Sequence, residues 1–197
     1  MKYGEKYEGR KFRVEFVRDG AAPERVLKGI RDAGSALDRL GLTPENAGNI
    51  SVRSNEGMHI TVGGVGKGRL SEDDVVEVLD FDFERAVVVG GKEPSSETPM
   101  HWLIYQSYPM ANAVIHAHDE LAVDSAKKLK ETIGVETTEA HAHYGTDDQA
   151  YQVIETLKHA QYAIIRGHGV VCMGESLEEC VCLIVNIHRS LQADINR

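Results

Sequence analysis

The stretch PSSETPMHWLIYQSYPMANAVIHAH, residues 94–118, contains a polar loop, a predicted helix and a predicted strand, in that order. Thr98 and Pro99 suit the N-cap and the first turn of the helix. Residues 113–118 begin as an apolar run and end with two histidines, which is typical of a strand that leaves a core. A helix followed directly by a buried strand favours a protein of the α/β class.

Strands and helices alternate on both sides of this stretch as well. The predicted helices follow Pro23 up to Gly41, cover 121–129, run from Thr146 to about 158, and start at Ser176; the predicted strands cover 12–16, 49–53, 58–62, 75–80, 86–89, 163–165 and 170–173. This order predicts an α/β fold with one domain over residues 23–197. Residues 1–22 differ from the rest and are expected to form an N-terminal extension with one strand.

Composition limits the class of protein and its partners. The 197 residues are too few for two ordinary domains, and 42% of them are hydrophobic, as expected for a globular chain. The net charge of −9 disfavours nucleic acid as a partner. No apolar run approaches the roughly 20 residues that cross a bilayer, and the charged N-terminus lacks a signal-peptide core. With three cysteines and no CxxC pair, we expect free thiols, a cytoplasmic location and no membrane partner.

Three histidines form the strongest chemical signal. His116 and His118 lie two residues apart on a predicted strand, so their side chains point to the same side. His168 lies between Gly167 and Gly169, which let the backbone turn and bulky groups approach. Three neutral imidazoles with one open position are typical of a catalytic zinc site. The alternative is that these are ordinary surface histidines.

The loop before the helix carries a second signal. Ser95, Ser96 and Glu97 lie at the predicted helix start, where hydroxyl and N–H groups suit an anion such as phosphate. Beside a metal ion, Glu97 can act as a general acid and base, or ligate the ion until substrate displaces it. An ordinary helix cap is the alternative interpretation.

Two further features stay open at this point. His141 and His143 repeat the spacing of the first pair but lie in a polar stretch, so they are read as surface histidines or as a reserve metal or substrate site. The glycine-rich residues 63–68 do not match a P-loop or a dinucleotide-binding fingerprint. They form either an anion cradle or a flexible turn.

Four strings together resemble the class II aldolase/adducin family, especially its L-fuculose-1-phosphate aldolases. They are AGNISVR (47–53), ITVGGVGKGRLSEDDVV (60–76), the stretch at 94–118, and RGHGVVCMGESLEE (166–179). The resemblance implies a three-layer α/β/α fold with a central, largely antiparallel sheet. It also implies a homotetramer with active sites at the subunit interfaces.

The resemblance further implies a reaction and a set of site residues. The expected activity is the reversible cleavage of a small ketose phosphate, such as L-fuculose 1-phosphate, into dihydroxyacetone phosphate and an aldehyde through a metal-stabilised enediolate. The implied residues are His116, His118 and His168 for one Zn²⁺ or other divalent metal ion per subunit, Glu97 as acid/base and possible resting-state ligand, and Gly48, Asn49, Gly64, Ser95 and Ser96 for the substrate phosphate.

Other members of the family define the alternatives. A methylthioribulose-1-phosphate dehydratase keeps a glutamate at the position of Glu97, whereas an L-ribulose-5-phosphate 4-epimerase usually has an aspartate there. Adducin heads share the fold as interaction modules but lack the metal histidines, so an adducin-like binding module is less favoured by this sequence.

Overall fold

The computed structural model describes residues 9–195, so residues 1–8 of the predicted extension lie outside the described part. The elements are β1 (Arg13–Arg18), α1 (Glu24–Asp38), β2 (Asn49–Arg53), β3 (Met58–Thr61), the 3₁₀ turns η1 (Lys67–Arg69) and η2 (Glu72–Asp74), β4 (Val75–Phe81), β5 (Arg85–Val89), α2 (Thr98–Ser107), β6 (Ala113–Ala117), α3 (Glu120–Asp124), α4 (Ala126–Ile133), β7 (Glu136–Thr137), α5 (Asp147–Thr156), β8 (Tyr162–Ile165), β9 (Gly169–Gly174) and α6 (Leu177–Ile195).

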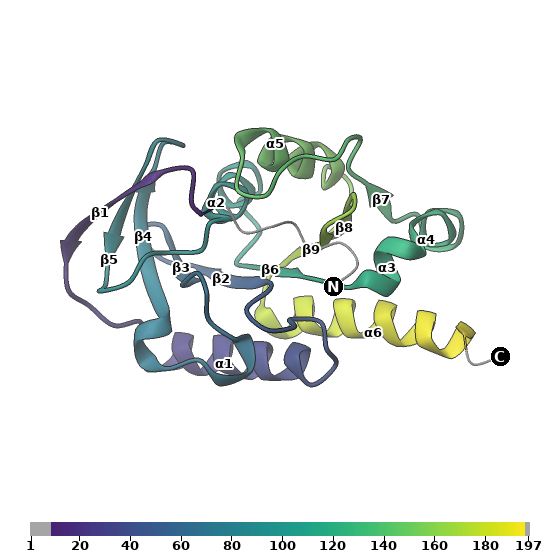
Figure 1. Ribbon diagram of the computed structural model, residues 1–197, viewed down its shortest axis with the longest axis horizontal. Coiled ribbons are helices and arrows are strands. Elements are labelled where there is room, and N and C mark those ends of the chain that lie inside the picture. Colours follow the sequence, from purple (N-terminus) through teal and green to yellow (C-terminus); the bar gives the residue numbers. More distant parts are fainter. Residues whose placement is uncertain (1–8, 196–197) are drawn as a thin grey trace.

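The elements form three layers around one nine-stranded sheet (Figure 1). Helices α1 and α6 pack together on one face of the sheet, and α2 and α5 pack together on the other. Each face has its own hydrophobic core. This is the α/β/α arrangement that the family resemblance implies.

The sheet is mixed, and this corrects the expectation of a largely antiparallel one. The strand order is β1-β5-β4-β3-β2-β6-β9-β8-β7, and both edge pairs, β1 with β5 and β7 with β8, run parallel. The strands between them pair antiparallel. The edge strands become parallel because each reaches its neighbour through a crossover rather than a hairpin: α1 and β2–β4 separate β1 from β5, and α5 separates β7 from β8.

The central strand β6 shows how the sheet directs side chains. Ile115 and Ala117 belong to the core beneath α1 and α6, whereas Val114 belongs to the core beneath α2 and α5. Because side chains alternate along a strand, His116 faces the same side as Val114. The histidine pair therefore begins on the α2/α5 side of the sheet.

The predicted helix over 121–129 is wrong in one respect, because the structure divides it into α3 and α4 at Ser125. Asp119 caps α3 by accepting a hydrogen bond from the Ala122 N–H. Ala122 of α3 and Leu129 of α4 are buried in the same core, beneath α1 and α6. By contrast, the predicted cap of α5 is confirmed, since Thr146 accepts from the backbone N–H of Gln149.

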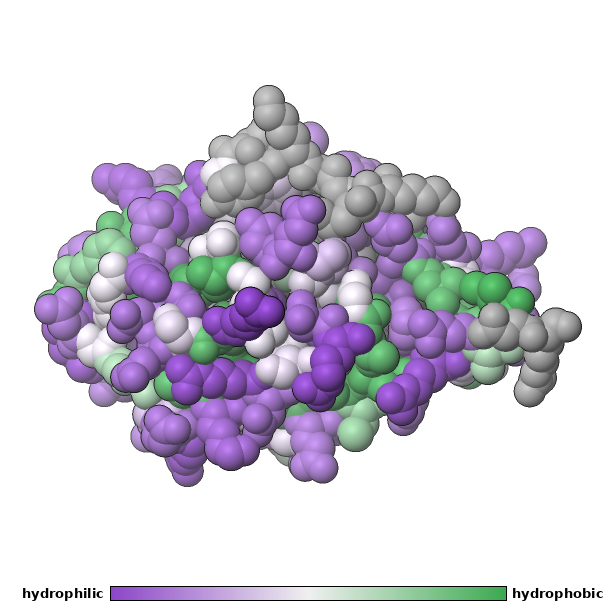
Figure 2. All heavy atoms as spheres, turned by 60° about the horizontal axis from the view of Figure 1, so that its bottom comes forward, coloured by the Kyte–Doolittle hydropathy of each residue, from purple (hydrophilic) through white to green (hydrophobic). Residues whose placement is uncertain are grey.

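Helix α1 shows how the outer layers meet solvent. Its residues Leu27, Ile30 and Leu37 are buried against the sheet. The lower side of Figure 1, turned forward in Figure 2, is mostly hydrophilic, with hydrophobic side chains in small groups.

Among the described residues, no helix combines the length and apolar character needed to span a bilayer.

Candidate metal centre and active site

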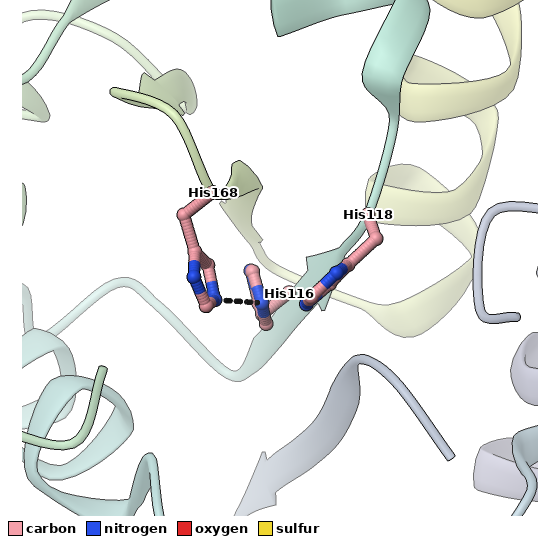
Figure 3. Close-up of side chains that lie close together, drawn as sticks. All are labelled: His116, His118 and His168. Carbon is pink, nitrogen blue, oxygen red and sulfur yellow. Dashed lines mark hydrogen bonds between the residues drawn. The ribbon is translucent and has the colours of Figure 1, made fainter. Parts of the chain in front are cut away.

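Three imidazoles from two parts of the chain meet at one end of β6. His116 lies one residue before the end of β6, His118 directly follows the strand, and His168 lies in the turn between β8 and β9. One ligand atom from each lies within 4.8 Å of the others (Figure 3). The Nε2 atoms of His116 and His168 are 3.1 Å apart. Two nitrogens about 2.1 Å from a tetrahedral zinc ion lie roughly 3.4 Å apart, so this geometry suits a metal ion.

Two glycines make this convergence possible. Gly167 has φ +68°, a conformation that lets the β8–β9 turn present His168 to the sheet. At Gly169, a Cβ atom would lie 2.4 Å from the Ala117 carbonyl oxygen and 3.0 Å from Cε1 of His116. Only glycine allows β9 to approach the histidine strand this closely.

The orientation of His116 fits a bound cation. Its Nδ1 lies 2.9 Å from the Val170 carbonyl oxygen, which can only accept, so the proton is on Nδ1 and Nε2 carries a lone pair. That Nε2 lies 3.3 Å from Oε2 of Glu97. Two acceptor atoms facing each other repel unless a cation or proton lies between them. The pair therefore fits a metal ion, which the backbone carbonyl would help to orient.

Burial keeps the imidazoles of His116 and His118 neutral. It lowers the pKa of His116 to about 4 and that of His118 to about 3. Both rings are therefore uncharged at neutral pH, the form in which imidazole binds a metal ion.

Glu97 occupies the centre of the site as a buried carboxylate. Burial alone would raise its pKa, but hydrogen bonds from His168 and the Asn49 amide hold the pKa well below the ordinary value. Oε2 accepts a 2.7 Å hydrogen bond from Asn49 Nδ2, and Oε1 accepts one of 3.3 Å from Gln149 Nε2. Oε1 also lies 3.4 Å from Nε2 of His168. Glu97 is therefore ionised and held from several sides.

A pocket opens beside this cluster, and most of the expected site residues line it. They are Gly48, Asn49, Gly64, Ser95, Ser96, Glu97, His118 and His168. His116 is fully buried behind them. The expected phosphate-binding residues thus lie next to the expected metal ligands. The amide of Asn49 differs from the expectation in one respect, since it is already bonded to Glu97.

Lys67 and Gln149 belong to the site, although sequence reasoning did not select them. Lys67 lines the pocket and is 1% exposed. Its ammonium donates to the Asn46 carbonyl at 3.0 Å and to the Val65 carbonyl at 2.5 Å. A lysine between two glycines was the available signal for Lys67. The sequence around Gln149 indicates only a helix cap, and no local pattern predicts that Gln149 lies near Glu97.

The second histidine pair lies outside the metal cluster. His141 and His143 are exposed, with ring centroids 5.8 Å apart. In the described part of the chain, the group whose ligand atoms converge is His116, His118 and His168. The neighbouring Tyr144 does line the pocket.

The fold and the site define a class of α/β/α proteins with a histidine cluster that could hold a metal ion, and sequence comparison gives the family. The family model "Class II Aldolase and Adducin N-terminal domain" matches residues 28–195. The chain belongs to the class II aldolase and adducin family.

Relatives within the family carry two different reaction names. Methylthioribulose-1-phosphate dehydratase of Acidiphilium cryptum is 32% identical over 170 residues, covering 75% of this chain and 79% of the relative. L-fuculose phosphate aldolase of Escherichia coli K12 is 31% identical over 170 residues, covering 81% and 77%. The crystal structure of L-fuculose-1-phosphate aldolase from Thermus thermophilus matches with a TM-score of 0.72 and 27% identity, covering 88% and 94% of the two chains.

Proposed function

We propose that this protein is a metal-dependent aldolase that reversibly cleaves a small ketose phosphate into dihydroxyacetone phosphate and an aldehyde. The observation that carries the proposal is the position of the Glu97 carboxylate. It lies 3.3 and 3.4 Å from Nε2 atoms of two converging imidazoles and borders a pocket lined by Ser95 and Ser96. The residues for the substrate phosphate, the proton acceptor and the metal ligands can therefore all contact one small molecule.

His116, His118 and His168 would hold one divalent ion, for which we favour Zn²⁺. Such an ion supplies Lewis-acid polarisation of the substrate's carbonyl and hydroxyl oxygens. The protein's contribution is the positioning of neutral imidazoles, which burial provides.

The phosphate group would bind where the α2 N-terminus meets the glycine-rich loop. Ser95 and Ser96 precede the helix, and Gly64, with φ +75°, leaves open space on the other side. Gly48 and Asn49 complete this part of the pocket. Binding of the phosphate at a helix N-terminus would fix the reacting carbons beside Glu97.

Glu97 would move the proton at the carbon next to the carbonyl. In the direction of condensation, its ionised carboxylate takes the proton from that carbon of dihydroxyacetone phosphate; in cleavage it returns the proton to the same carbon. Its lowered pKa keeps the resting group in the basic form.

A dehydratase reaction is the second candidate, because methylthioribulose-1-phosphate dehydratases are among the most similar relatives. Loss of water from a ketose phosphate also starts with removal of a proton next to the carbonyl, so the same Glu97 position suits it.

Product analysis of the metal-loaded protein tests the two reactions. L-fuculose 1-phosphate and methylthioribulose 1-phosphate are incubated separately with it. Dihydroxyacetone phosphate from the first substrate supports the aldolase. A dehydrated product from the second, with no carbon–carbon cleavage of either, replaces the aldolase with the dehydratase. No turnover of these or other ketose phosphates would favour an adducin-like binding module.

The domain organisation and the oligomeric state of the protein are also open to proposal. We infer that residues 23–197 form the catalytic domain, that residues 1–22 are an extension, and that the protein is a homotetramer. Light scattering during size-exclusion chromatography would test the assembly, and a monomeric mass would overturn it.

A further inference from the structure

His101 lies one helical turn after Glu97 and is fully buried. Its Nε2 is 2.5 Å from Oδ1 of Asn49, and its Nδ1 is 2.6 Å from the Ser51 hydroxyl. Ser51 is in turn 2.8 Å from the hydroxyl of Tyr105. A buried chain of hydrogen bonds therefore runs from Tyr105 to Glu97.

The chain results from matching periodicities. Asn49 and Ser51 lie two residues apart on β2, so they share a face of the sheet. His101 and Tyr105 are spaced by four residues and share a face of α2, and Glu97, four residues before His101, is the N-cap of this helix. This face of β2 packs against this face of α2, and the polar side chains of the strand form hydrogen bonds with those of the helix.

The hydrogen bond between Asn49 and Glu97 determines which group donates and which accepts in every other hydrogen bond of this chain. Asn49 donates from its amide nitrogen to Oε2 of Glu97 and presents its amide oxygen to His101. That oxygen can only accept, so Nε2 of His101 must carry the proton. Burial lowers the pKa of His101 to about 4, so the ring has one proton and Nδ1 accepts from Ser51. Ser51 then accepts from Tyr105.

This direction matters for the carboxylate. If nothing held its oxygen, the Asn49 amide could rotate by half a turn and present that oxygen to Glu97. Two acceptors would then face each other in a buried site, and Glu97 would lose its shortest hydrogen bond.

We propose that His101 is a positioning residue, which in its neutral Nε2–H tautomer holds the Asn49 amide so that its nitrogen donates to Glu97. The proposal deepens the function proposed above, because it assigns a residue that keeps the acid/base group in place. His101 itself does not line the pocket.

Kinetics of three variants separate positioning from general stability. Loss of one buried hydrogen bond to a charged group corresponds to a decrease of roughly 10- to 100-fold, so H101L should lower kcat by that factor with KM unchanged. H101Q can still donate to Asn49 and should recover most of kcat. H59L removes another buried imidazole, on β3 and outside the pocket, and should leave kcat unchanged. Equal kcat for H101L and wild type would overturn the proposal.

Nitrogen NMR of histidine-labelled protein tests the tautomer without any activity. The expected result is a neutral Nε2–H pattern for the His101 signal, identified by its loss in H101Q, in metal-free and metal-loaded protein alike. An Nδ1–H or doubly protonated ring at neutral pH would overturn the proposal. If no ketose phosphate is turned over, the proposed function fails, but the NMR measurement still decides the role of His101. If H101L does not fold, H101Q and the spectrum decide it.

Discussion

At the scale of single residues, the Glu97 side chain has a charge that its surroundings stabilise. Its carboxylate is buried, and it contacts the amides of Asn49 and Gln149 and two imidazoles. A neutral amide at this position would keep the shape of the side chain but could not take up a proton. The contacts that position the group and the chemistry that it performs can therefore be separated by one substitution.

We expect E97Q to keep the bound metal and to lose most turnover. Loss of a general acid/base typically lowers kcat by roughly 10²- to 10⁴-fold. Metal content per chain and steady-state kinetics give both quantities. E93Q is the matched control, because Glu93 is an exposed partner of Arg10 outside the pocket lining. Wild-type kcat in E97Q would remove Glu97 from the mechanism.

Lys67 makes the stability of the chain depend on pH. Burial lowers the pKa of Lys67 to about 8, from 10.5 for an ordinary lysine, with partial opposition from Glu97 and Asp74. Between these two values the unfolded chain binds more protons than the folded one. The free energy of unfolding therefore rises with pH across this window, and one pKa unit corresponds to about 1.4 kcal/mol.

The unfolding free energy of wild type minus that of K67M should rise by about 3 kcal/mol between pH 8 and pH 10.5. Urea unfolding of the metal-free proteins at a series of pH values measures it. K92M serves as control, because Asp74 raises the pKa of exposed Lys92 and its charge stays constant over most of this window. A difference for K67M that does not vary with pH would contradict the prediction.

At the scale of elements, the site depends on how closely β9 approaches β6. Gly169 has no side chain where a Cβ atom would meet the Ala117 carbonyl oxygen and the His116 ring. The backbone carbonyl of Val170, one residue on, orients the same ring. The strand pair therefore sets both the stability of the sheet and the direction of one metal ligand.

G169A should destabilise the fold and weaken metal binding together. Inserting a group into a packed contact typically costs about 1–3 kcal/mol, and loss of ligand orientation typically lowers metal affinity by roughly 10- to 100-fold. Urea unfolding and a zinc titration measure the two effects. G91A is the control, because a Cβ atom there meets nothing within 4 Å. Wild-type zinc affinity in G169A would show that the strand spacing does not control the site.

The elements also show what local sequence can and cannot predict. The alternation of side chains along a strand was enough to place His116 and His118 on one side, and the structure brings His168 to them. The parallel pairing of β1 depends instead on distant contacts, such as the edge-to-face packing of Phe12 on Phe81. His101 and Gln149 reach Glu97 or its partner only through the meeting of separate elements, so local periodicity did not identify them.

At the scale of the whole molecule, the candidate site joins parts of the chain that are far apart in sequence. The end of β6, the β8–β9 turn, the start of β2 and the start of α2 all contribute to it. A metal ion bound there would link these elements in the folded chain and would have no equivalent site in the unfolded one. Metal binding should therefore stabilise the entire fold and not only the pocket.

We expect protein purified without chelator to contain about one divalent ion per chain, and stripping it to lower Tm by about 5–10 °C. At a free metal concentration of about 100 times Kd, binding adds about 2.7 kcal/mol, and each kcal/mol corresponds to about 2–4 °C for a chain of this length. Elemental analysis and thermal unfolding before and after chelation measure the two quantities, and added zinc should restore Tm.

Two histidine variants show where the ion binds. H168A should abolish the metal-dependent part of Tm, because it removes one of the three converging ligands. A double substitution, H141A with H143A, alters the pair that has the same spacing as His116 and His118 but lies outside the cluster, and it should leave metal content unchanged. If the double variant lost the ion while H168A kept it, the metal centre would lie at the exposed pair, and the assignment of Glu97 as a group beside the metal would be wrong.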